Sequence, residues 1–426
     1  MADVKKTVLF DRHAPSASCE AREGGKSQIV PFAGWLMPLW YQSISAEHEA
    51  VRRTAGLFDC THMAVLQIAG KNAQDFLNIL TTNDVSTPHL LSVQSCEYLE
   101  GAGSMLKPGK AQYSYILNSI GNIIDDIIVY CIADDNYMMV VNAANEQKVK
   151  DWIAKVHSEP LLADSKWQIV IKDLKDASLP DAKVDIALQG PASAQCLKNI
   201  FGTDLGKLKS FTFTSIETKD LNLIISRTGY TGAKVGFEIF VHPSKATLLW
   251  DTILDKGKKL GVIPCGLGAR DSLRIEAGLP LYGHELAGEF NISPFQAGYG
   301  WAVKLQKENF IGKEAIAKKA IDFQTEVARL EFGGGKGIRP IRQLDGILDS
   351  SGICIGHVLS CAGVGDRQIV LALIEKQYDI IDSPVGIYYL ARNQNHIQQG
   401  RQEKVKIGDS LTADLAGKVV ERFEKF

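Results

Sequence analysis

Two adjacent carboxylates, Asp125 and Asp126, interrupt an apolar run of the sequence, GNIIDDIIVY at residues 121–130. The run has the β-branched composition of a buried strand, where aspartate is uncommon and costly to bury. Because successive side chains of a strand point to opposite faces, only one of the two can serve a given pocket. A carboxylate on an apolar strand can stabilise a cationic intermediate, and it can equally anchor the structure. The pattern alone leaves both interpretations open.

A glycine-rich stretch, SRTGYTGAKVGFEIFV at residues 226–241, carries another candidate carboxylate. Its glycines surround Tyr230 and permit a tight loop in which the backbone can approach a ligand. Glu238 follows on an expected strand, where it could accept two parallel hydrogen bonds from a flat edge such as that of a pterin or guanine. The alternative is a glycine-rich hairpin with a surface glutamate. The sequence has no G-x-x-x-x-G-K-S/T phosphate loop and no dinucleotide-binding G-x-G-x-x-G motif.

Two arginines share one face of an expected helix over residues 266–278. Arg270 and Arg274 lie four residues apart, with Asp271 and Glu276 close enough for ion pairs. A pair of arginines can hold a ligand carboxylate, because each guanidinium presents a rigid fork of donors. The alternative is a structurally paired or solvated charge cluster.

These residues must be positioned by a mixture of helices and antiparallel strands. Helical periods predict helices over 45–56, 145–159 and 243–257, with Ser45, Asn145 and Ser244 as N-caps. Strand patterns cover residues 123–132, 137–142, 221–227 and 237–242. The polar turn at 133–136 joins the first two strands into a hairpin, which indicates an α+β fold rather than a doubly wound sheet.

Two other regions differ in character. Residues 86–109 show no sustained period and predict an irregular, exposed loop. After about residue 325 the helical patterns nearly vanish, and short strand-like runs are separated by turn residues. They predict a separate small β-domain, either a sandwich or a barrel.

The composition is that of an ordinary globular protein. A chain of 426 residues with 45% hydrophobic content is expected to form two or three domains. Its formal net charge of −2 argues against binding nucleic acid or an anionic membrane. We expect no transmembrane helix, no signal or transit peptide and hence a cytoplasmic location. The eight cysteines form no C-x-x-C pair and the histidines no H-x-x-x-H cluster, so we expect reduced thiols and no metal.

Taken together, these stretches resemble the glycine cleavage system T protein family. The matching segments run in the family's order from about residue 31 to 316, and include FAGWLMP, TTNDV, GKAQYSYILN, IIDDIIVY, VVNAANEQK, ALQGP, RTGYTG, GFEIFV and CGLGARDSLRIEAGLPLYGHE. The resemblance implies a three-lobed α+β fold around a central folate channel, with a C-terminal β-barrel. Residues 1–324 would form the folate-binding region as two intertwined lobes, and residues 325–426 the barrel.

The resemblance also implies roles for single residues. Asp126 matches the family's catalytic acid beside the folate ring, which leaves Asp125 as a structural neighbour. Glu238 matches the ligand of the pterin edge. Met63 matches an apolar lining residue of the folate site, and Tyr113 and Tyr230 match its aromatic walls. Arg270 matches the anchor of the folate tail.

The implied reaction is aminomethyl transfer to tetrahydrofolate. The donor is an aminomethyl group on the lipoyl arm of the H protein, the expected partner. Folate N5 attacks the methylene, ammonia leaves, and the products are 5,10-methylenetetrahydrofolate and the dihydrolipoyl protein. This chemistry needs a positioned nucleophile, an anion near developing iminium charge, and exclusion of water. No metal is implied.

Several positions depart from the family pattern and keep two alternatives open. Ala233–Val235 replace an acidic pair after GYTG, Gln296 replaces an acid, DCTHM replaces DVSHM, and the 86–109 segment is longer than usual. These changes could accompany a different donor, as in a tetrahydrofolate-dependent demethylase of a small amine, sulfonium compound or aryl ether. The second alternative is a non-catalytic folate-binding protein. Such relatives carry a Lys-Gly-Cys motif that is absent here, and the presence of both Asp126 and Glu238 counts against that alternative.

Overall fold

The structure, a computed structural model, describes residues 4–13, 28–85, 106–158, 167–424 and 426. The chain forms two compact units. The first comprises Met1–Gly229, Ala233–Ala269 and Trp301–Ala317, and the second Tyr230–Gly232, Arg270–Gly300 and Lys318–Phe426. The irregular loop predicted at 86–109 lies, up to residue 105, outside the described residues.

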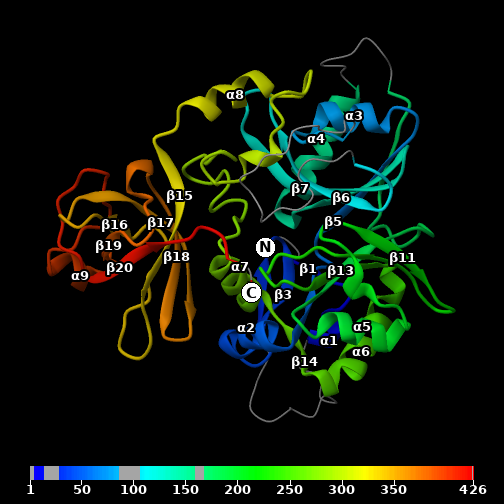
Figure 1. The fold of residues 1–426 in the computed structure, drawn as a ribbon, viewed down its shortest axis with the longest axis horizontal. Coiled ribbons are helices and arrows are strands. Elements are labelled where there is room, and N and C mark those ends of the chain that lie inside the picture. Colours follow the sequence, from blue (N-terminus) through cyan, green and yellow to red (C-terminus); the bar gives the residue numbers. More distant parts are fainter. Residues whose placement is uncertain (1–3, 14–27, 86–105, 159–166, 425) are drawn as a thin grey trace. The chain divides into compact units, whose positions relative to one another are not determined.

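A five-stranded sheet in the first unit carries the acid pair (Figure 1). Its order is β6-β7-β8-β5-β9, with bounds Lys110–Leu117, Ile123–Ala133, Asn136–Val141, Ala64–Ala69 and Val170–Asp173. Helices α3 (Ala73–Leu80) and α4 (Glu146–Ser158) pack on one face. Val149, Ile153 and Val156 of α4 are buried in that core, as the helical period predicts.

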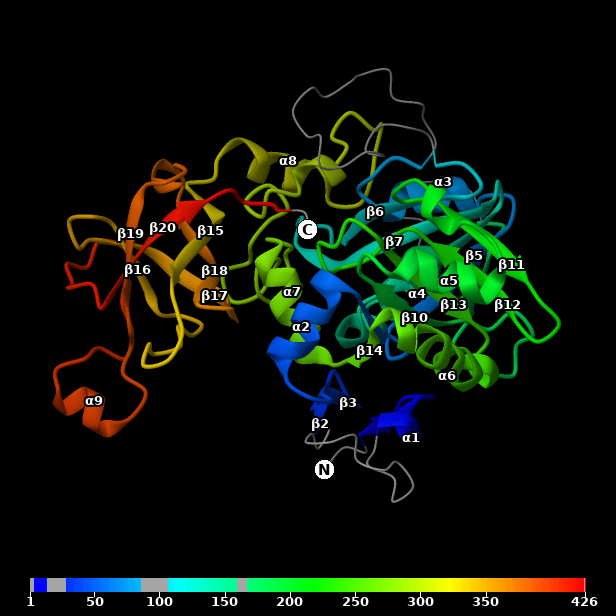
Figure 2. The same ribbon diagram turned by 60° about the horizontal axis from the view of Figure 1, so that its bottom comes forward.

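A six-stranded sheet in the same unit carries Glu238 and both ends of the glycine-rich loop, whose residues Tyr230–Gly232 belong to the second unit. Its order is β11-β12-β13-β10-β4-β14, with bounds Phe213–Glu217, Asn222–Ser226, Gly236–Val241, Val184–Gln189, Ala55–Asp59 and Val262–Cys265. Helices α5 (Ser193–Phe201) and α6 (Ala246–Gly257) lie side by side and cover one face (Figures 1 and 2). Every residue of β10 and β13 is buried, which explains their nearly continuous apolar composition.

The two sheets meet through a shared apolar cluster. Val65, Tyr130 and Met138 of the five-stranded sheet pack in it with Phe240 of the six-stranded sheet. Met63, Ile128 and Phe213 are among the partly buried residues that pack against this cluster. The faces that carry Asp126 and Glu238 are therefore held together by packing within one unit.

The N-terminal elements complete the first unit. A three-stranded sheet has the order β1-β3-β2, with bounds Lys5–Lys6, Trp35–Trp40 and Gln28–Phe32. Two helices accompany it, α1 (Phe10–His13) and α2 (Ile44–Arg53). His13 of α1 is buried, with Nε2 2.8 Å from Asp59 Oδ2, and this contact ties the short helix to β4.

The predicted N-caps were wrong at all three helices, for local reasons. The N-cap of helix α2 lies two residues earlier than expected, at Ser43, whose hydroxyl accepts the Ala46 N–H. Short 3₁₀ turns at 143–145 and 243–245 precede α4 and α6. The side chain of Asn145 therefore donates to Asp125 instead of capping, and the ring of His242, not Ser244, accepts the first free N–H.

The second unit contains a closed six-stranded barrel, which confirms the predicted C-terminal β-structure. Its order is β15-β18-β17-β16-β19-β20, with bounds Thr325–Gly333, Arg367–Glu375, Cys354–Val364, Gly346–Leu348, Pro384–Tyr388 and Leu415–Val420. Helix α9 (Gln394–Gln398) stands away from the barrel wall (Figure 2). Helices α7 (Leu267–Glu276) and α8 (Lys313–Ile321) each begin in the first unit and end in the second. Because the second unit also takes in 270–300, a domain boundary at 325 stays a prediction.

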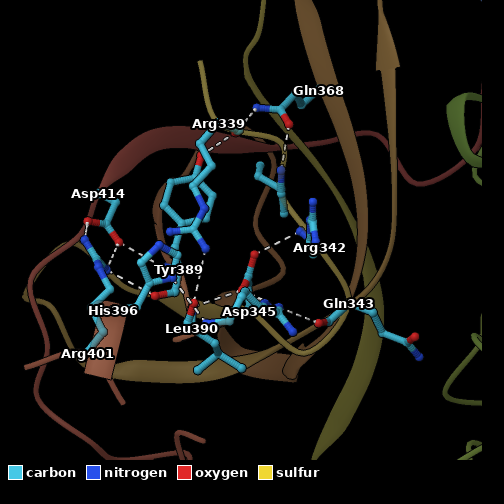
Figure 3. Close-up of polar contacts among 12 residues, drawn as sticks. Arg339, Arg342, Gln343, Asp345, Gln368, Tyr389, Leu390, His396, Arg401 and Asp414 are labelled. Atoms are coloured by element: carbon cyan, nitrogen blue, oxygen red, sulfur yellow. Dashed lines mark hydrogen bonds and ion pairs between the residues drawn. The ribbon is translucent and has the colours of Figure 1, made fainter. Parts of the chain in front are cut away.

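A polar network links the segments that precede β16 and β20 to the segment that follows β19 (Figure 3). Buried Asp345 accepts the backbone N–H groups of Arg342 and Leu390 at 2.9 and 3.0 Å, and the Arg392 guanidinium at 2.7 Å. Asp414 accepts the Tyr389 N–H and pairs with Arg401. These carboxylates supply hydrogen-bond acceptors for the backbone N–H groups of Arg342, Tyr389 and Leu390.

Candidate functional site

The acid pair lies on β7 with its two side chains on opposite faces of the sheet, as strand alternation predicts. Ile127 and Val129, on the face of Asp125, belong to the core beneath α3 and α4. Ile128 and Tyr130, on the face of Asp126, belong to the cluster between the two sheets.

Asp125 is a buried structural anchor. Its side chain is 0% exposed and accepts hydrogen bonds from the Asn142 N–H and side-chain amide, both at 2.9 Å, and from Asn145 Nδ2 at 2.5 Å. These donors lie in the segment that leads from β8 into α4. The arrangement agrees with the interpretation of Asp125 as a structural neighbour.

Asp126 is half-buried and faces different partners. Its Oδ2 accepts the Tyr113 hydroxyl at 3.0 Å, and its Oδ1 accepts Asn142 Nδ2 at 2.9 Å. Tyr113 is the diagonal cross-strand neighbour on β6, since Tyr115 pairs with Asp126 and Tyr113 with Ile128.

Asn142 bridges the two carboxylates, a contact that the sequence analysis missed. It follows β8, whose last residue Val141 pairs with Ile127, so its amide lies beside the acid pair and reaches both side chains. The only signal in the sequence is an asparagine directly after a strand that pairs with β7. The two acids are therefore coupled through Asn142, although their side chains lie on opposite faces of the sheet.

Burial raises the pKa values of both acids, and the charge of Asp126 adds to the increase at Asp125. Burial raises the pKa of Asp126 to about 6, although the hydrogen bonds from Tyr113 and Asn142 oppose this change. Burial raises the pKa of Asp125 to about 8, and the charge of Asp126 contributes to that increase. The two acids therefore titrate as a coupled pair, and the hydrogen bonds from Tyr113 and Asn142 favour the charged form of Asp126.

We predict that activity falls as the pH is lowered through about 6, because protonation removes the Asp126 anion. Tyr113→Phe removes a hydrogen bond that lowers the pKa of Asp126, so the acid limb should move to higher pH. The measurement is the pH dependence of kcat for both proteins. Tyr378→Phe is the matched control, because Tyr378 packs against the barrel core of the second unit. An acid limb at the same pH in Tyr113→Phe and wild type would contradict the prediction.

Aromatic rings and a polar turn hold Tyr113. Its ring lies edge-on to Tyr115, with centroids 5.3 Å apart, and tilted against Trp301 at 5.8 Å. Asn83 Nδ2 donates to the Tyr113 carbonyl at 2.8 Å, and the Asn83 N–H donates to Ser114 Oγ at 2.9 Å. The TTNDV segment therefore fixes the strand that presents Tyr113.

Glu238 is 9% exposed and held by hydroxyl groups. Its Oε2 accepts the Thr228 hydroxyl at 2.5 Å and the Tyr130 hydroxyl at 3.2 Å. Thr228 Oγ1 also lies 2.9 Å from Ser226 Oγ, and since a hydroxyl has one proton, Ser226 donates to Thr228 when Thr228 donates to the carboxylate. Both hydroxyl donors converge on one carboxylate oxygen, so a ligand N–H is best accommodated at the other, Oε1.

Met63 is connected to Glu238 through the apolar cluster between the two sheets. It packs against the apolar cluster that contains Tyr130, whose hydroxyl bonds Glu238. Within the first unit, Tyr113 contacts Asp126 directly. Met63 is connected to Glu238 indirectly, through Tyr130.

The other two predicted positions belong to the second unit. The Arg270 guanidinium lies over the Tyr230 ring, 5.2 Å from its centroid, and the Tyr230 hydroxyl donates to the Pro280 carbonyl at 2.5 Å. The structure thus pairs the predicted tail anchor with a predicted aromatic wall.

Arg274, the other arginine of the expected pair, is committed to structure. It is 1% exposed, and Nη1 lies 2.6 Å from Glu285 Oε2, while Nε contacts Asp271 at 2.8 Å and Nη2 contacts Ser360 at 2.9 Å. A ligand carboxylate would therefore be held by Arg270 and not by both arginines.

We predict that Arg274→Met lowers the free energy of unfolding by roughly 3–5 kcal/mol, because it leaves Glu285 buried without its cation. The measurement is denaturant unfolding followed by circular dichroism. Arg367→Met is the matched control, since the Arg367–Glu331 pair is exposed, and it should cost less than about 1 kcal/mol. Equal losses in the two variants would contradict the structural role of Arg274.

Within the described ranges, no three His, Cys, Asp or Glu side chains gather in a way that could hold a metal ion. Among the helices of the described part of the chain, none has the length and apolar character needed to cross a membrane.

Comparison with known proteins gives concordant matches. Residues 19–307 match the family model for the GCVT N-terminal domain. An aminomethyltransferase of Desulforamulus reducens is 38% identical over 319 residues, which are 75% of this chain and 76% of that protein. An aminomethyltransferase of Alkaliphilus metalliredigens is 36% identical over 391 residues, 91% of this chain and 94% of that protein.

A solved structure resembles the whole chain. It is that of the glycine cleavage system aminomethyltransferase T from Bartonella henselae, at 26% sequence identity and a TM-score of 0.73. The match covers 99% of each chain, and so includes the C-terminal barrel, which the family model does not reach.

Proposed function

Because this chain belongs to the glycine cleavage T protein family of aminomethyltransferases, we propose that it transfers a one-carbon unit from an aminomethyl-lipoyl H protein to tetrahydrofolate. In this reaction the methylene carbon leaves sulfur and nitrogen and becomes bonded to N5 and N10 of the folate. The two protons that N5 and N10 lose go to the departing amine, which leaves as ammonia, and to the lipoyl sulfur. The products are 5,10-methylenetetrahydrofolate and the dihydrolipoyl protein.

The observation that carries this proposal is the environment of Asp126. Its carboxylate lies on an apolar strand beside a second buried acid, and it is oriented by hydrogen bonds from Tyr113 and Asn142. A fixed anion in a low-dielectric site stabilises developing positive charge more strongly than water does. We therefore assign Asp126 the task of stabilising iminium character on the transferred methylene.

Binding of the folate follows from the other positions. Glu238 accepts a pterin N–H at Oε1, and Met63 contributes apolar contact near it. Tyr113 presents a ring held between Tyr115 and Trp301. Arg270, stacked on Tyr230, pairs with the carboxylate of the folate tail.

The relatives' names favour aminomethyl transfer over both alternatives. Two of the departures from the family pattern also have structural roles that do not involve a donor. Val235 packs against the core of the six-stranded sheet, and its carbonyl accepts the Gly190 N–H at 2.9 Å. Gln296 accepts the Ser293 N–H and hydroxyl and donates to Thr325 Oγ1 at 3.1 Å.

The donor can be tested by identifying the folate product. Protein is incubated with tetrahydrofolate and either aminomethyl-lipoyl H protein or a set of methylated amines, sulfonium compounds and aryl ethers. We expect 5,10-methylenetetrahydrofolate to form when aminomethyl-lipoyl H protein is the donor, and no product with any of the small molecules. Formation of 5-methyltetrahydrofolate from a methylated small molecule, and no product with the H protein, would favour the demethylase.

A further inference from the structure

We propose that Gln189 is a positioning residue for Glu238, acting by clamping the two ends of the glycine-rich loop with its side-chain amide. This inference rests on the proposed function, since it assigns Gln189 a part in folate binding through Glu238. The residue is the last of β10, lies in the ALQGP segment and is 2% exposed.

The clamp consists of two hydrogen bonds from one amide nitrogen. Gln189 Nε2 donates to the Thr228 carbonyl and to the Phe237 carbonyl, each at 3.2 Å. Thr228 directly precedes the loop of residues 229–236, and Phe237 directly follows it. The amide therefore holds the two ends of the loop at a fixed separation.

Two glycines of the loop are explained by the space that this amide occupies. A Cβ added at Gly229 would lie 2.0 Å from Gln189 Oε1, and one added at Gly236 would lie 2.4 Å from the same atom. Neither glycine has the positive φ that would itself require glycine, in contrast to Gly232 at +73°. Glycine at positions 229 and 236 therefore leaves room for the Gln189 amide.

The clamped residues are those that position the carboxylate. The hydroxyl of Thr228 donates to Glu238 Oε2 at 2.5 Å, and Phe237 is the residue before Glu238. Ser226, which supports Thr228, pairs with Glu238 across β12 and β13. A shift of either loop end would therefore move the hydroxyl donor or the carboxylate, and both determine where Oε1 faces a ligand.

Loss of the clamp should weaken folate binding through Glu238. Gln189→Met keeps a similar volume and removes both hydrogen bonds, so tetrahydrofolate should bind roughly 3- to 30-fold more weakly. The effect should appear mainly in Kd and KM, with a smaller change in kcat at saturating folate, because Asp126 is untouched. Gln67→Met is the matched control, since its amide bonds Asn136 in the other sheet, and it should leave the folate Kd unchanged.

The test is a double-mutant cycle read out by titrating tetrahydrofolate into full-length protein. We expect Gln189→Met to weaken binding in the wild-type background and to change it by less than about twofold in the Glu238→Gln background. Equal weakening in both backgrounds, or none in either, would overturn the inference. Gln189→Leu also lacks the donor and replaces the methionine variant if that protein does not fold. Failure of the wild type to bind tetrahydrofolate would instead overturn the proposed function.

Discussion

Replacing Asp126 by asparagine is expected to lower kcat for folate-dependent aminomethyl transfer by roughly 10²- to 10³-fold. The substitution keeps the shape of the side chain and removes the negative charge beside the transferred methylene. Hydrogen bonds to Tyr113 and Asn142 connect this carboxylate to the strand and its neighbour, so the fold should be retained. Tetrahydrofolate affinity should change little, because the charge acts on the transition state rather than on the bound folate. The measurement is steady-state kinetics together with a folate titration.

Asp125→Asn is the informative comparison for this first result. Asp125 is buried on the opposite face and accepts three hydrogen bonds from Asn142 and Asn145. Its replacement should reduce stability more than it reduces kcat per folded molecule. A variant at Asp125 that loses as much kcat as Asp126→Asn, with its stability unchanged, would contradict the assignment of the charge to Asp126.

Replacing Glu238 by glutamine is expected to weaken tetrahydrofolate binding by roughly 10- to 100-fold. A hydrogen bond to a charged group contributes about 1.5–3 kcal/mol, and a neutral amide cannot replace the carboxylate as acceptor toward both the hydroxyls and the ligand. Thr228 and Tyr130 donate to one oxygen of the carboxylate, so the amide must also turn its NH₂ group toward the ligand N–H or toward these hydroxyls. The measurement is calorimetric titration of tetrahydrofolate.

Glu217→Gln provides the control for this second result. Glu217 is exposed at the end of β11 in the same sheet, and its replacement should leave the affinity unchanged. An unchanged affinity in Glu238→Gln would remove the proposed pterin contact, whatever the kinetic behaviour of Asp126→Asn.

The sequence was sufficient where the physics is local. Alternation along β7 placed Asp125 and Asp126 on opposite faces, and the hairpin at 133–136 placed β8 beside them. The apolar period of α4 identified its buried face. The pattern of strands could indicate only a sandwich or a barrel, because closure depends on the pairing of β15 with β20, whose paired residues are 85 or more positions apart.

What the sequence could not reveal are contacts between distant segments. Gln189 reaches Thr228 and Phe237 across 39 and 48 residues, and no local pattern marks a glutamine as a clamp. Lys307 donates to carbonyls near the end of α3, more than 220 residues earlier in the chain. The bridge from Asn142 to both acids likewise depends on register at the end of β8. Such groups acquire a role only when the sheets have formed.

Ammonia release from aminomethyl-lipoyl H protein is the most direct test of the proposed reaction. It is measured with and without tetrahydrofolate, in wild type and Asp126→Asn. We predict rapid ammonia release by the wild type that requires tetrahydrofolate, and a rate at least about 100-fold lower in Asp126→Asn at saturating folate. Absence of ammonia release by a wild-type protein that binds tetrahydrofolate tightly would contradict the proposed reaction.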